Sequence, residues 1–226
     1  MATRIASGKP PGGGPSDRTD GRRRRATAAA LRPRLRALRA AMSAADRAAA
    51  DARIAAFLQG RIHDYLAGDR PGRRVVLSAF WPIGDEPDLR PALQAWARDE
   101  RLQLALPIIL AKAAPLAFRA WTPDTRMAPG AYGIPEPRST PPCTPDIVLA
   151  PTLGYTVDGD RIGYGGGYYD RTLAALRAEG RPILALGVAY ACGRLAPDVH
   201  VPEPHDMRLD AIVSEEGWMD GAHIAP

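Results

Sequence analysis

The stretch "RIGYGGGYYDRT", residues 161–172, gathers residue types that could bind a phosphate and a metal ion. It holds four of the chain's 22 glycines, and glycines let backbone N–H groups approach a phosphate without interference from a Cβ atom. Asp170 follows directly, where its carboxylate could hold Mg²⁺ against the bound phosphates. A flexible hairpin without a ligand would explain the glycines alone, so the acid is what favours a phosphate-binding loop.

Two well-known phosphate motifs do not fit this stretch. A P-loop requires Lys followed by Ser or Thr after the last glycine, but Tyr168 and Tyr169 stand there. A dinucleotide fingerprint requires a glycine at the position of Tyr168. If the loop binds phosphate, it does so as a different motif.

The loop must be positioned by the elements around it, and these read as an α/β fold. Apolar runs without alternation, interleaved with helical segments, are typical of strands buried on both faces of a largely parallel sheet. The predicted strands are 75–81, 102–109, 116–121, 146–151, 182–188 and 211–216, and the predicted helices between them are 89–100 and Tyr168–Ala178. The loop would then lie beyond the carboxyl end of the strand 146–151, where ligands collect in open α/β sheets.

Two helices are expected before the first strand. The first has an apolar face formed by Leu31, Leu35, Leu38 and Met42, and Pro33 places its start close to Arg32 because proline fits the first turn. Ser43, with Asp46 three residues later, reads as the N-cap of the second. The inward residues of this second helix are Ile54, Phe57, Leu58, Ile62 and Tyr65. The proline-rich segment from Thr122 to Pro145 is expected to be a long irregular loop.

The net charge of +5 divides unevenly along the chain. Residues 1–40 carry eleven Lys/Arg against two Asp, so the remainder is mildly acidic. We therefore expect residues 1–25 to be a disordered basic arm and residues 26–226 to form one domain. Nucleic-acid binding by the arginines at 22–25 is not expected, because no aromatic residues are interleaved with them.

Cysteine content and hydropathy bear on the compartment. Cys143 and Cys192 lie far apart without a CxxC partner, which favours neither a disulfide framework nor a zinc site. No stretch has the length of a membrane span and the start lacks an apolar signal region. We expect a cytoplasmic protein, without a membrane partner, that is a monomer.

The motif "DGDRIGYGGGYYDRTL" resembles the signature of the 5-formyltetrahydrofolate cyclo-ligase (5,10-methenyltetrahydrofolate synthetase) family. The similarity extends over about residues 28–218. It includes the Arg-rich opening helix followed by "AMSAADR", and further along "FWPIGDEPD", "YGIPEP" and "EPHDMRLDAIVSEEGW". The resemblance implies a single α/β domain like the NagB/RpiA/CoA-transferase-like fold.

The activity that the resemblance implies is an ATP- and Mg²⁺-dependent closure of 5-formyltetrahydrofolate to 5,10-methenyltetrahydrofolate, with release of ADP and phosphate. The loop would bind the ATP phosphates through Arg161, Ile162, Gly163, Tyr164, Gly165, Gly166, Gly167, Tyr168 and Tyr169. Arg161 and Tyr168 would also serve catalysis, although which of the two tyrosines faces the ligand stays open. Asp170 and Asp206 match the family's metal positions, and Trp81 and Glu86 match its folate contacts.

One departure from the family pattern concerns the opening helix. Arg32 matches the second basic residue of the family's Lys-x-x-x-Arg, but the lysine position falls on Ala28. Arginine is not a neutral replacement for lysine at a phosphate, so nucleotide binding is the property most affected.

Several simpler interpretations stay beside these. Glu86 could be an acid at a helix start, but Asp88 is the better cap. His205 next to Asp206 is more typical of a turn than of a metal or acid–base site. A noncatalytic ATP- or folate-binding relative, or an RNA-associated one, would explain the missing lysine. An isomerase or CoA-transferase on a similar scaffold would need a catalytic acid–His set or a nucleophilic glutamate, and we find neither.

Overall fold

The computed structural model describes residues 26–68, 73–196 and 199–220. The predicted arm, residues 1–25, lies outside the described residues.

The centre of the fold is a seven-stranded sheet, as far as the described residues go, with the order β11-β10-β9-β6-β1-β2-β3. β10, β9, β6, β1 and β2 run parallel, and β3 and β11 close the two edges as antiparallel strands. The bounds are β1 Val75–Ser78, β2 Leu102–Ile108, β3 Ala117–Ala120, β6 Ile147–Pro151, β9 Leu184–Val188, β10 Ala211–Ser214 and β11 Gly217–Asp220. The prediction of a single α/β domain with a mostly parallel sheet is confirmed.

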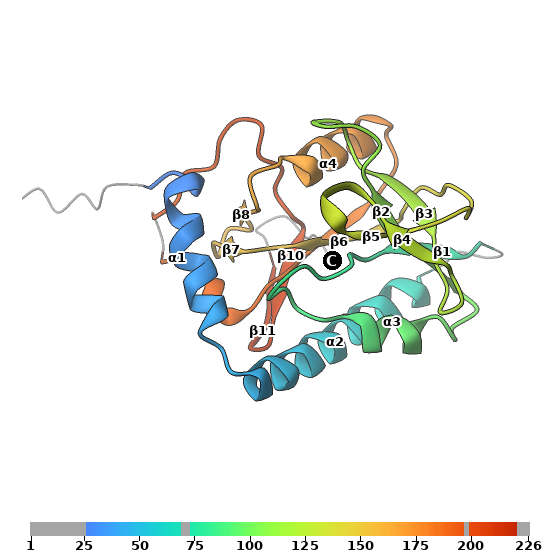
Figure 1. Ribbon diagram of the computed structural model, residues 1–226, viewed down its shortest axis with the longest axis horizontal. Helices are drawn as coiled ribbons and strands as arrows, with labels where there is room; N and C mark the ends of the chain where they lie inside the picture. Colours follow the sequence, from blue (N-terminus) through green and yellow to red (C-terminus); the bar gives the residue numbers. More distant parts are fainter. Residues whose placement is uncertain (1–25, 69–72, 197–198, 221–226) are drawn as a thin grey trace, which may run out of the picture.

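Helices cover both faces of this sheet (Figure 1). α2 (Ala44–Ala67) and α3 (Arg90–Trp96) lie on one face, and α4 (Tyr168–Ala178) lies on the other. Alternate residues of β6 serve the two cores: Ile147 and Leu149 pack with α2 and α3, whereas Val148 and Ala150 pack with α4. All five residues of β6 are buried, which explains why its sequence is continuously apolar. The prediction that this strand is buried on both faces is confirmed.

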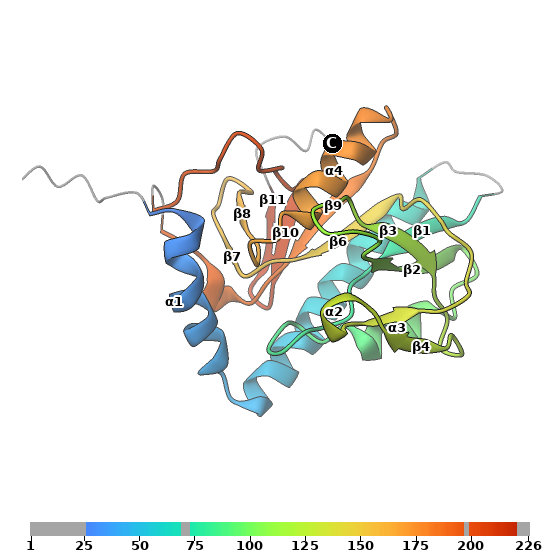
Figure 2. The same ribbon diagram turned by 45° about the horizontal axis from the view of Figure 1, so that its top comes forward.

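α1 (Ala28–Ala40) stands apart from these layers, beside a small ribbon formed by β7 (Gly154–Tyr155) and β8 (Arg161–Ile162) (Figures 1 and 2). Leu31 and Leu35 of α1 pack against Leu153 and Ile162 in a third apolar cluster. This contact places α1 next to the glycine-rich loop that connects β8 to α4.

The prediction for the first helix was wrong about where the helix begins and about one residue of its buried face. The helix begins at Ala28, not near Arg32, because Thr27 caps it by accepting the N–H of Ala30, so Pro33 lies inside the helix. Leu38, predicted to face inward, is 41% exposed, and Arg39 is buried in its place. The Thr27 cap and the burial of Leu31 and Leu35 stabilise the helix although Pro33 lies inside it.

The second helix agrees with its prediction. Ser43 accepts the N–H of Asp46 at 3.0 Å, and Ile54 is fully buried. Leu58 and Ile62 are also fully buried, while Phe57 and Tyr65 are partly buried against the same core.

The proline-rich segment is more regular than predicted. It contains a short hairpin of β4 (Met127–Pro129) and β5 (Pro135–Pro137), joined through a 3₁₀ turn at Ala131–Gly133. Proline lacks a backbone donor, which argued against strands, yet Pro129 and Pro135 are paired with each other across the hairpin. The remaining short element is a 3₁₀ turn at Ala191–Gly193. Within the described residues, no helix has the length and apolar character required to cross a membrane.

Candidate active site

A cavity of about 510 Å³ opens at the carboxyl ends of β1, β2 and β6. This volume is in the range of small-molecule sites. Its wall contains the following residues proposed from the sequence: Arg32, Trp81, Glu86, Arg161, Gly163, Tyr164, Gly165, Gly166, Gly167, Tyr168, Tyr169, Asp170 and Asp206. Four separate segments of the chain that carry these residues therefore meet at one cavity.

Ile162 is the proposed residue that does not line this cavity. Its side chain is fully buried in the α1 cluster, and its carbonyl accepts the N–H of Leu153 at 2.9 Å. Ile162 thus anchors the glycine loop from behind.

The glycine loop requires its glycines. Gly165 has a φ of +96° and Gly167 a φ of +63°, which L-residues rarely adopt. A Cβ at Gly165 would lie 3.1 Å from the guanidinium of Arg32, whose Nε donates to the carbonyl of Gly163 at 2.8 Å. Gly167 is the N-cap of α4, so the loop ends at a helix N-terminus, which attracts anions. A phosphate group fits this cradle.

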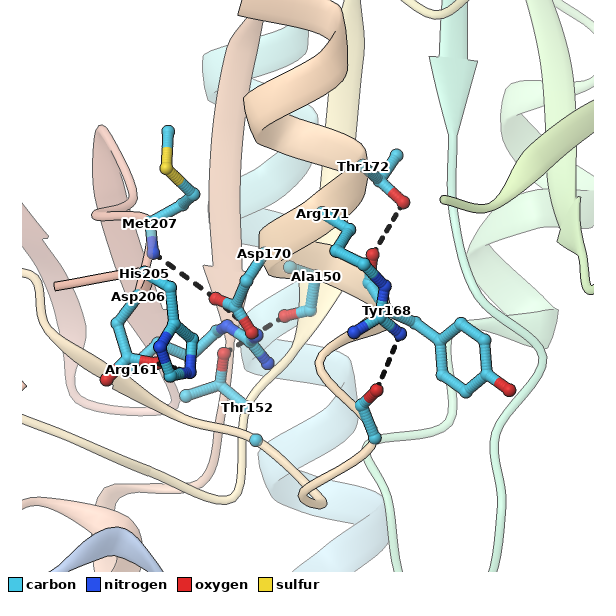
Figure 3. A network of polar contacts seen from close by, with 12 residues as sticks. Ala150, Thr152, Arg161, Tyr168, Asp170, Arg171, Thr172, His205, Asp206 and Met207 are labelled. Atoms are coloured by element: carbon cyan, nitrogen blue, oxygen red, sulfur yellow. Dashed lines mark hydrogen bonds and ion pairs between the residues drawn. The ribbon is translucent and has the colours of Figure 1, made fainter. Parts of the chain in front are cut away.

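Arg161 lines the cavity, and Figure 3 shows its contact with Asp170. Its Nη2 donates to both carboxylate oxygens of Asp170, at 3.0 and 3.2 Å, and its guanidinium lies 5.7 Å from the ring centroid of Tyr169. Its Nε is buried and has no partner among the described residues. An arginine with an unused buried donor at a cavity is suited to bind an anionic ligand.

Asp170 and Asp206 approach the cavity from different elements. Asp170 lies in the first turn of α4 and also accepts the N–H of Met207 at 3.3 Å (Figure 3). Asp206 accepts the N–H of Glu203 at 2.8 Å, and its other oxygen is 3.9 Å from Nε2 of His205. Within the described part of the chain, no three His, Cys, Asp or Glu side chains form a metal cage. Two carboxylates suffice for Mg²⁺, which commonly keeps waters and takes further oxygens from phosphates.

Tyr168 and Tyr169 play different structural parts, although both line the cavity. The hydroxyl of Tyr168 is 3.1 Å from that of Tyr132, and the two rings meet edge to face. Tyr169 packs against the core beneath Arg161, and burial raises the pKa of its hydroxyl, which therefore stays protonated. Tyr168 and Tyr169 thus line the same cavity with different neighbours, Tyr132 and Arg161 respectively.

Glu86 supplies a buried acid to the cavity. It is 5% exposed, and its Oε2 accepts the N–H of Ile83 at 2.9 Å. Burial raises the pKa of Glu86, whereas hydrogen bonds from Ile83 and Tyr164 oppose the rise. Asp88 was expected to cap α3, but Leu89 is the N-cap and no side chain caps this helix; Asp88 accepts the N–H of Arg90, the first helical residue, at 2.9 Å.

Trp81 lies nearby, half-buried, with the guanidinium of Arg90 5.8 Å from its ring centroid. Its indole extends the apolar wall formed by Ile83, Ile109 and Ile134.

Three residues near the cavity were not found from the sequence. Tyr132 and Glu136 line it, and both belong to the "YGIPEP" motif, which could have identified them. Arg39 lies behind the glycine loop, and its position four residues after Leu35 on the buried face was the available signal.

A largely parallel sheet with a glycine-rich loop and a buried acid at one carboxyl-end cavity is typical of an α/β enzyme for small molecules. Residues 24–215 match the 5-formyltetrahydrofolate cyclo-ligase family, and the chain belongs to that family.

Individual relatives agree with this family. The 5-formyltetrahydrofolate cyclo-ligase of Mycolicibacterium smegmatis is 29% identical over 68% of this chain and 79% of its own length. That of Haemophilus influenzae is 35% identical over 82 residues, which span 34% of this chain and only 43% of the relative. The solved structure of Aquifex aeolicus 5,10-methenyltetrahydrofolate synthetase, 23% identical, has the same fold with a TM-score of 0.68 over 88% of this chain and 95% of the other.

Proposed function

We propose that the protein catalyses the ATP- and Mg²⁺-dependent cyclisation of 5-formyltetrahydrofolate to 5,10-methenyltetrahydrofolate, with release of ADP and phosphate. The observation that carries this proposal is the shared cavity, in which the glycine loop and two carboxylates meet Glu86 and Trp81. A ligase must hold two substrates in contact, and one cavity with two chemically different parts meets that need.

The nucleotide part consists of the glycine loop with Arg32, Asp170 and Asp206. Backbone N–H groups at the start of α4 and the guanidinium of Arg32 would bind the phosphates. The two aspartates would hold Mg²⁺. Support comes from the positive φ angles of Gly165 and Gly167 and from the two carboxylates on one wall.

The folate part consists of Glu86 and Trp81. The pterin ring of the substrate carries N–H donors along one edge, and a buried carboxylate is a strong acceptor for them. The indole would contact the flat ring system. Support comes from the burial of Glu86 and from the apolar wall around it.

The chain's own part in the reaction is alignment and charge neutralisation. Bound ATP with Mg²⁺ would supply a phosphoryl group that makes the formyl oxygen a good leaving group. N10 would then bond to the formyl carbon and lose its proton as the carbon–oxygen bond breaks and phosphate departs. Arg161 and Tyr168 would stabilise the charge that develops on oxygen, because both line the cavity. The cavity wall would keep water from the activated carbon.

We further propose that residues 26–226 form the cyclo-ligase domain and that the protein is a cytoplasmic monomer. The basic residues at 22–25 are proposed to take no part in nucleic-acid binding.

A spectrophotometric assay tests the activity. Purified protein with 5-formyltetrahydrofolate, ATP and Mg²⁺ should form the methenyl product, and omission of ATP or Mg²⁺ should stop it. Binding of both substrates without product would identify a noncatalytic relative and refute the proposal.

A further inference from the structure

Asp160 is a buried acid that the proposed reaction does not use. It stands directly before Arg161, its side chain is 7% exposed, and it does not line the cavity. Its Oδ1 accepts a hydrogen bond from Nε of Arg208 at 2.9 Å, and its Oδ2 accepts one from the hydroxyl of Thr156 at 3.4 Å. A buried charge is costly unless it is paired, and Arg208 supplies the opposite charge. The pair joins two segments that lie far apart in the sequence.

Arg208 belongs to the segment that brings Asp206 to the cavity. We call residues 203–209 the Asp206 segment. Within it, Asp206 accepts the N–H of Glu203, which shapes the turn but does not determine where the turn lies in the fold. The side chain of Arg208 is 54% exposed, and its carbonyl accepts a hydrogen bond from Arg177 of α4 at 3.0 Å. Contacts of this kind with other parts of the chain must place the segment.

The neighbours of Arg208 make contacts in the same direction. The N–H of Met207 donates to Asp170 at 3.3 Å (Figure 3), and the N–H of Leu209 donates to the carbonyl of Gly159 at 3.4 Å. Both bonds are longer than the 2.9 Å bond from Arg208, and longer hydrogen bonds are weaker. The shortest of these three contacts is therefore the one that joins two opposite charges.

Asp160 and Arg161 are adjacent, and each is linked to a different carboxylate of the proposed metal site. Arg161 binds Asp170 directly, whereas Asp160 binds Arg208, two residues after Asp206. The residues at the start of β8 thus hold both carboxylates relative to the same piece of backbone. Because Mg²⁺ requires near-ideal octahedral geometry, a shift of either carboxylate should weaken its binding.

We propose that Asp160 is a positioning residue for the metal part of the site: through Arg208 it holds the Asp206 segment against the glycine loop, so that Asp206 and Asp170 share one Mg²⁺. It touches neither the ion nor a substrate. The identity of the ion rests on the proposed function, but the effect of Asp160 on the Asp206 segment does not.

Amide hydrogen exchange in the ligand-free, full-length protein tests the structural step. Asp160→Asn and Arg208→Met should each speed exchange in peptides that cover residues 203–209, because the segment loses its charged contact with the glycine loop. Arg208→Lys, which keeps the charge, should speed exchange less.

Arg73→Met is the matched control. Arg73 is 53% exposed and pairs with Asp146, which is 3% exposed, so this pair resembles Arg208 and Asp160 in burial. Asp146 precedes β6 and thus lies at the opposite end of the sheet from the cavity. A loss of stability from breaking such a pair would appear in both variants. Only Arg208→Met should change exchange at residues 203–209.

Nucleotide binding gives a second measurement. Calorimetry with a nonhydrolysable ATP analogue is carried out with Mg²⁺ and again with EDTA. Asp160→Asn and Arg208→Met should each bind the analogue about tenfold more weakly with Mg²⁺, the size expected when a residue that holds a metal ligand is replaced. In EDTA their affinity should match the wild type. The double variant should be no weaker than either single variant, because both changes break the same contact.

The outcomes are separable. An equal loss of affinity with Mg²⁺ and with EDTA would indicate a purely structural role and overturn the proposal. Unchanged exchange at residues 203–209 in a folded Arg208→Met protein would overturn it as well. If Asp160→Asn does not fold, Arg208→Met provides the same test. Wild-type protein whose analogue binding is independent of Mg²⁺ would overturn the proposed function of the two aspartates, while hydrogen exchange still decides whether Asp160 holds the Asp206 segment.

Discussion

Arg161 and Asp170 form an ion pair at the cavity, in which the single nitrogen Nη2 donates to both carboxylate oxygens, at 3.0 and 3.2 Å. Their side chains are 5% and 13% exposed. The pair joins β8 to the first turn of α4 and so closes the glycine loop at its two ends. In the proposed reaction Arg161 binds phosphate oxygens and Asp170 binds Mg²⁺. Ligand binding should therefore weaken the ion pair between Arg161 and Asp170.

Asp170→Asn should therefore reduce both activity and stability. Magnesium-dependent turnover should fall more than about 100-fold, because a neutral amide cannot offset the charge between metal and phosphate. The melting temperature should also fall, since Arg161 loses its buried counter-charge. Turnover across a magnesium titration and a thermal melt measure the two effects.

Asp206→Asn is the matched variant for that experiment. Asp206 is held by the N–H of Glu203 rather than by an arginine ion pair, so turnover should fall without a comparable loss of stability. Wild-type turnover in either variant would contradict the metal assignment.

Gly165→Ala should weaken nucleotide binding beyond its effect on stability. An alanine here must adopt an unfavourable positive φ, which costs about 1–2 kcal/mol. Its Cβ would also approach the guanidinium of Arg32 beside the glycine loop. Gly180→Ala is the control, because Gly180 has a φ of +70° with open space around its Cβ position. Both variants should lose similar stability, but only Gly165→Ala should bind an ATP analogue more weakly in calorimetry. Equal affinities would place the phosphates elsewhere.

Glu86→Gln should make the protein more stable at neutral pH while it weakens folate binding. Burial raises the pKa of Glu86 above its unfolded value of about 4.3, so the native state holds this proton more tightly than the unfolded state does. The wild type then loses stability as the pH rises through the native pKa, and glutamine does not. Denaturant unfolding should show an advantage for glutamine at pH 7 that shrinks as the pH falls toward 4.3. An advantage that grows on acidification would show that the sign of the shift is wrong.

Ala28→Lys should strengthen ATP binding. Ala28 lines the cavity at the position where the family's opening motif has a lysine, and a new charged hydrogen bond to phosphate there should give about tenfold. Ala29→Lys adds the same charge at an exposed neighbouring position and should have little effect. A similar gain in both variants would indicate a general charge effect and no restored contact.

Deletion of residues 1–25 should leave folding and turnover unchanged. The contacts that begin the domain, the N–H of Ala26 to the carbonyl of Val199 and the Thr27 cap, remain in the truncated chain. Steady-state kinetics for ATP would detect an exception. A large rise in KM would show that the arginines at 22–25 supply the charge missing at Ala28.

Local elements with strong patterns could be predicted from the sequence. α4 runs from Tyr168 to Ala178 as expected, and Ser43 caps α2 as expected, because capping and helical periodicity depend on residues within one or two turns. The two-residue strands β7 and β8 could not be predicted, since a pair so short carries no periodicity. The β4–β5 hairpin was missed because its prolines mask the strand signal.

The chemistry of the site was also encoded locally, in the glycines, the acid after them and the motif around Glu86. Each of these is a property of a few adjacent residues and can be read without knowledge of the fold. The Arg161–Asp170 pair spans only the glycine loop, whereas Asp206 reaches the same cavity from a separate segment of the chain, which only the fold brings there. The exchange of Leu38 for Arg39 on the buried face of α1 likewise depends on Tyr164 and Thr152, more than 100 residues away. The sequence by itself determined which groups are present, whereas only the tertiary structure decided their partners, because burial and charge pairing arise between segments that are distant along the chain.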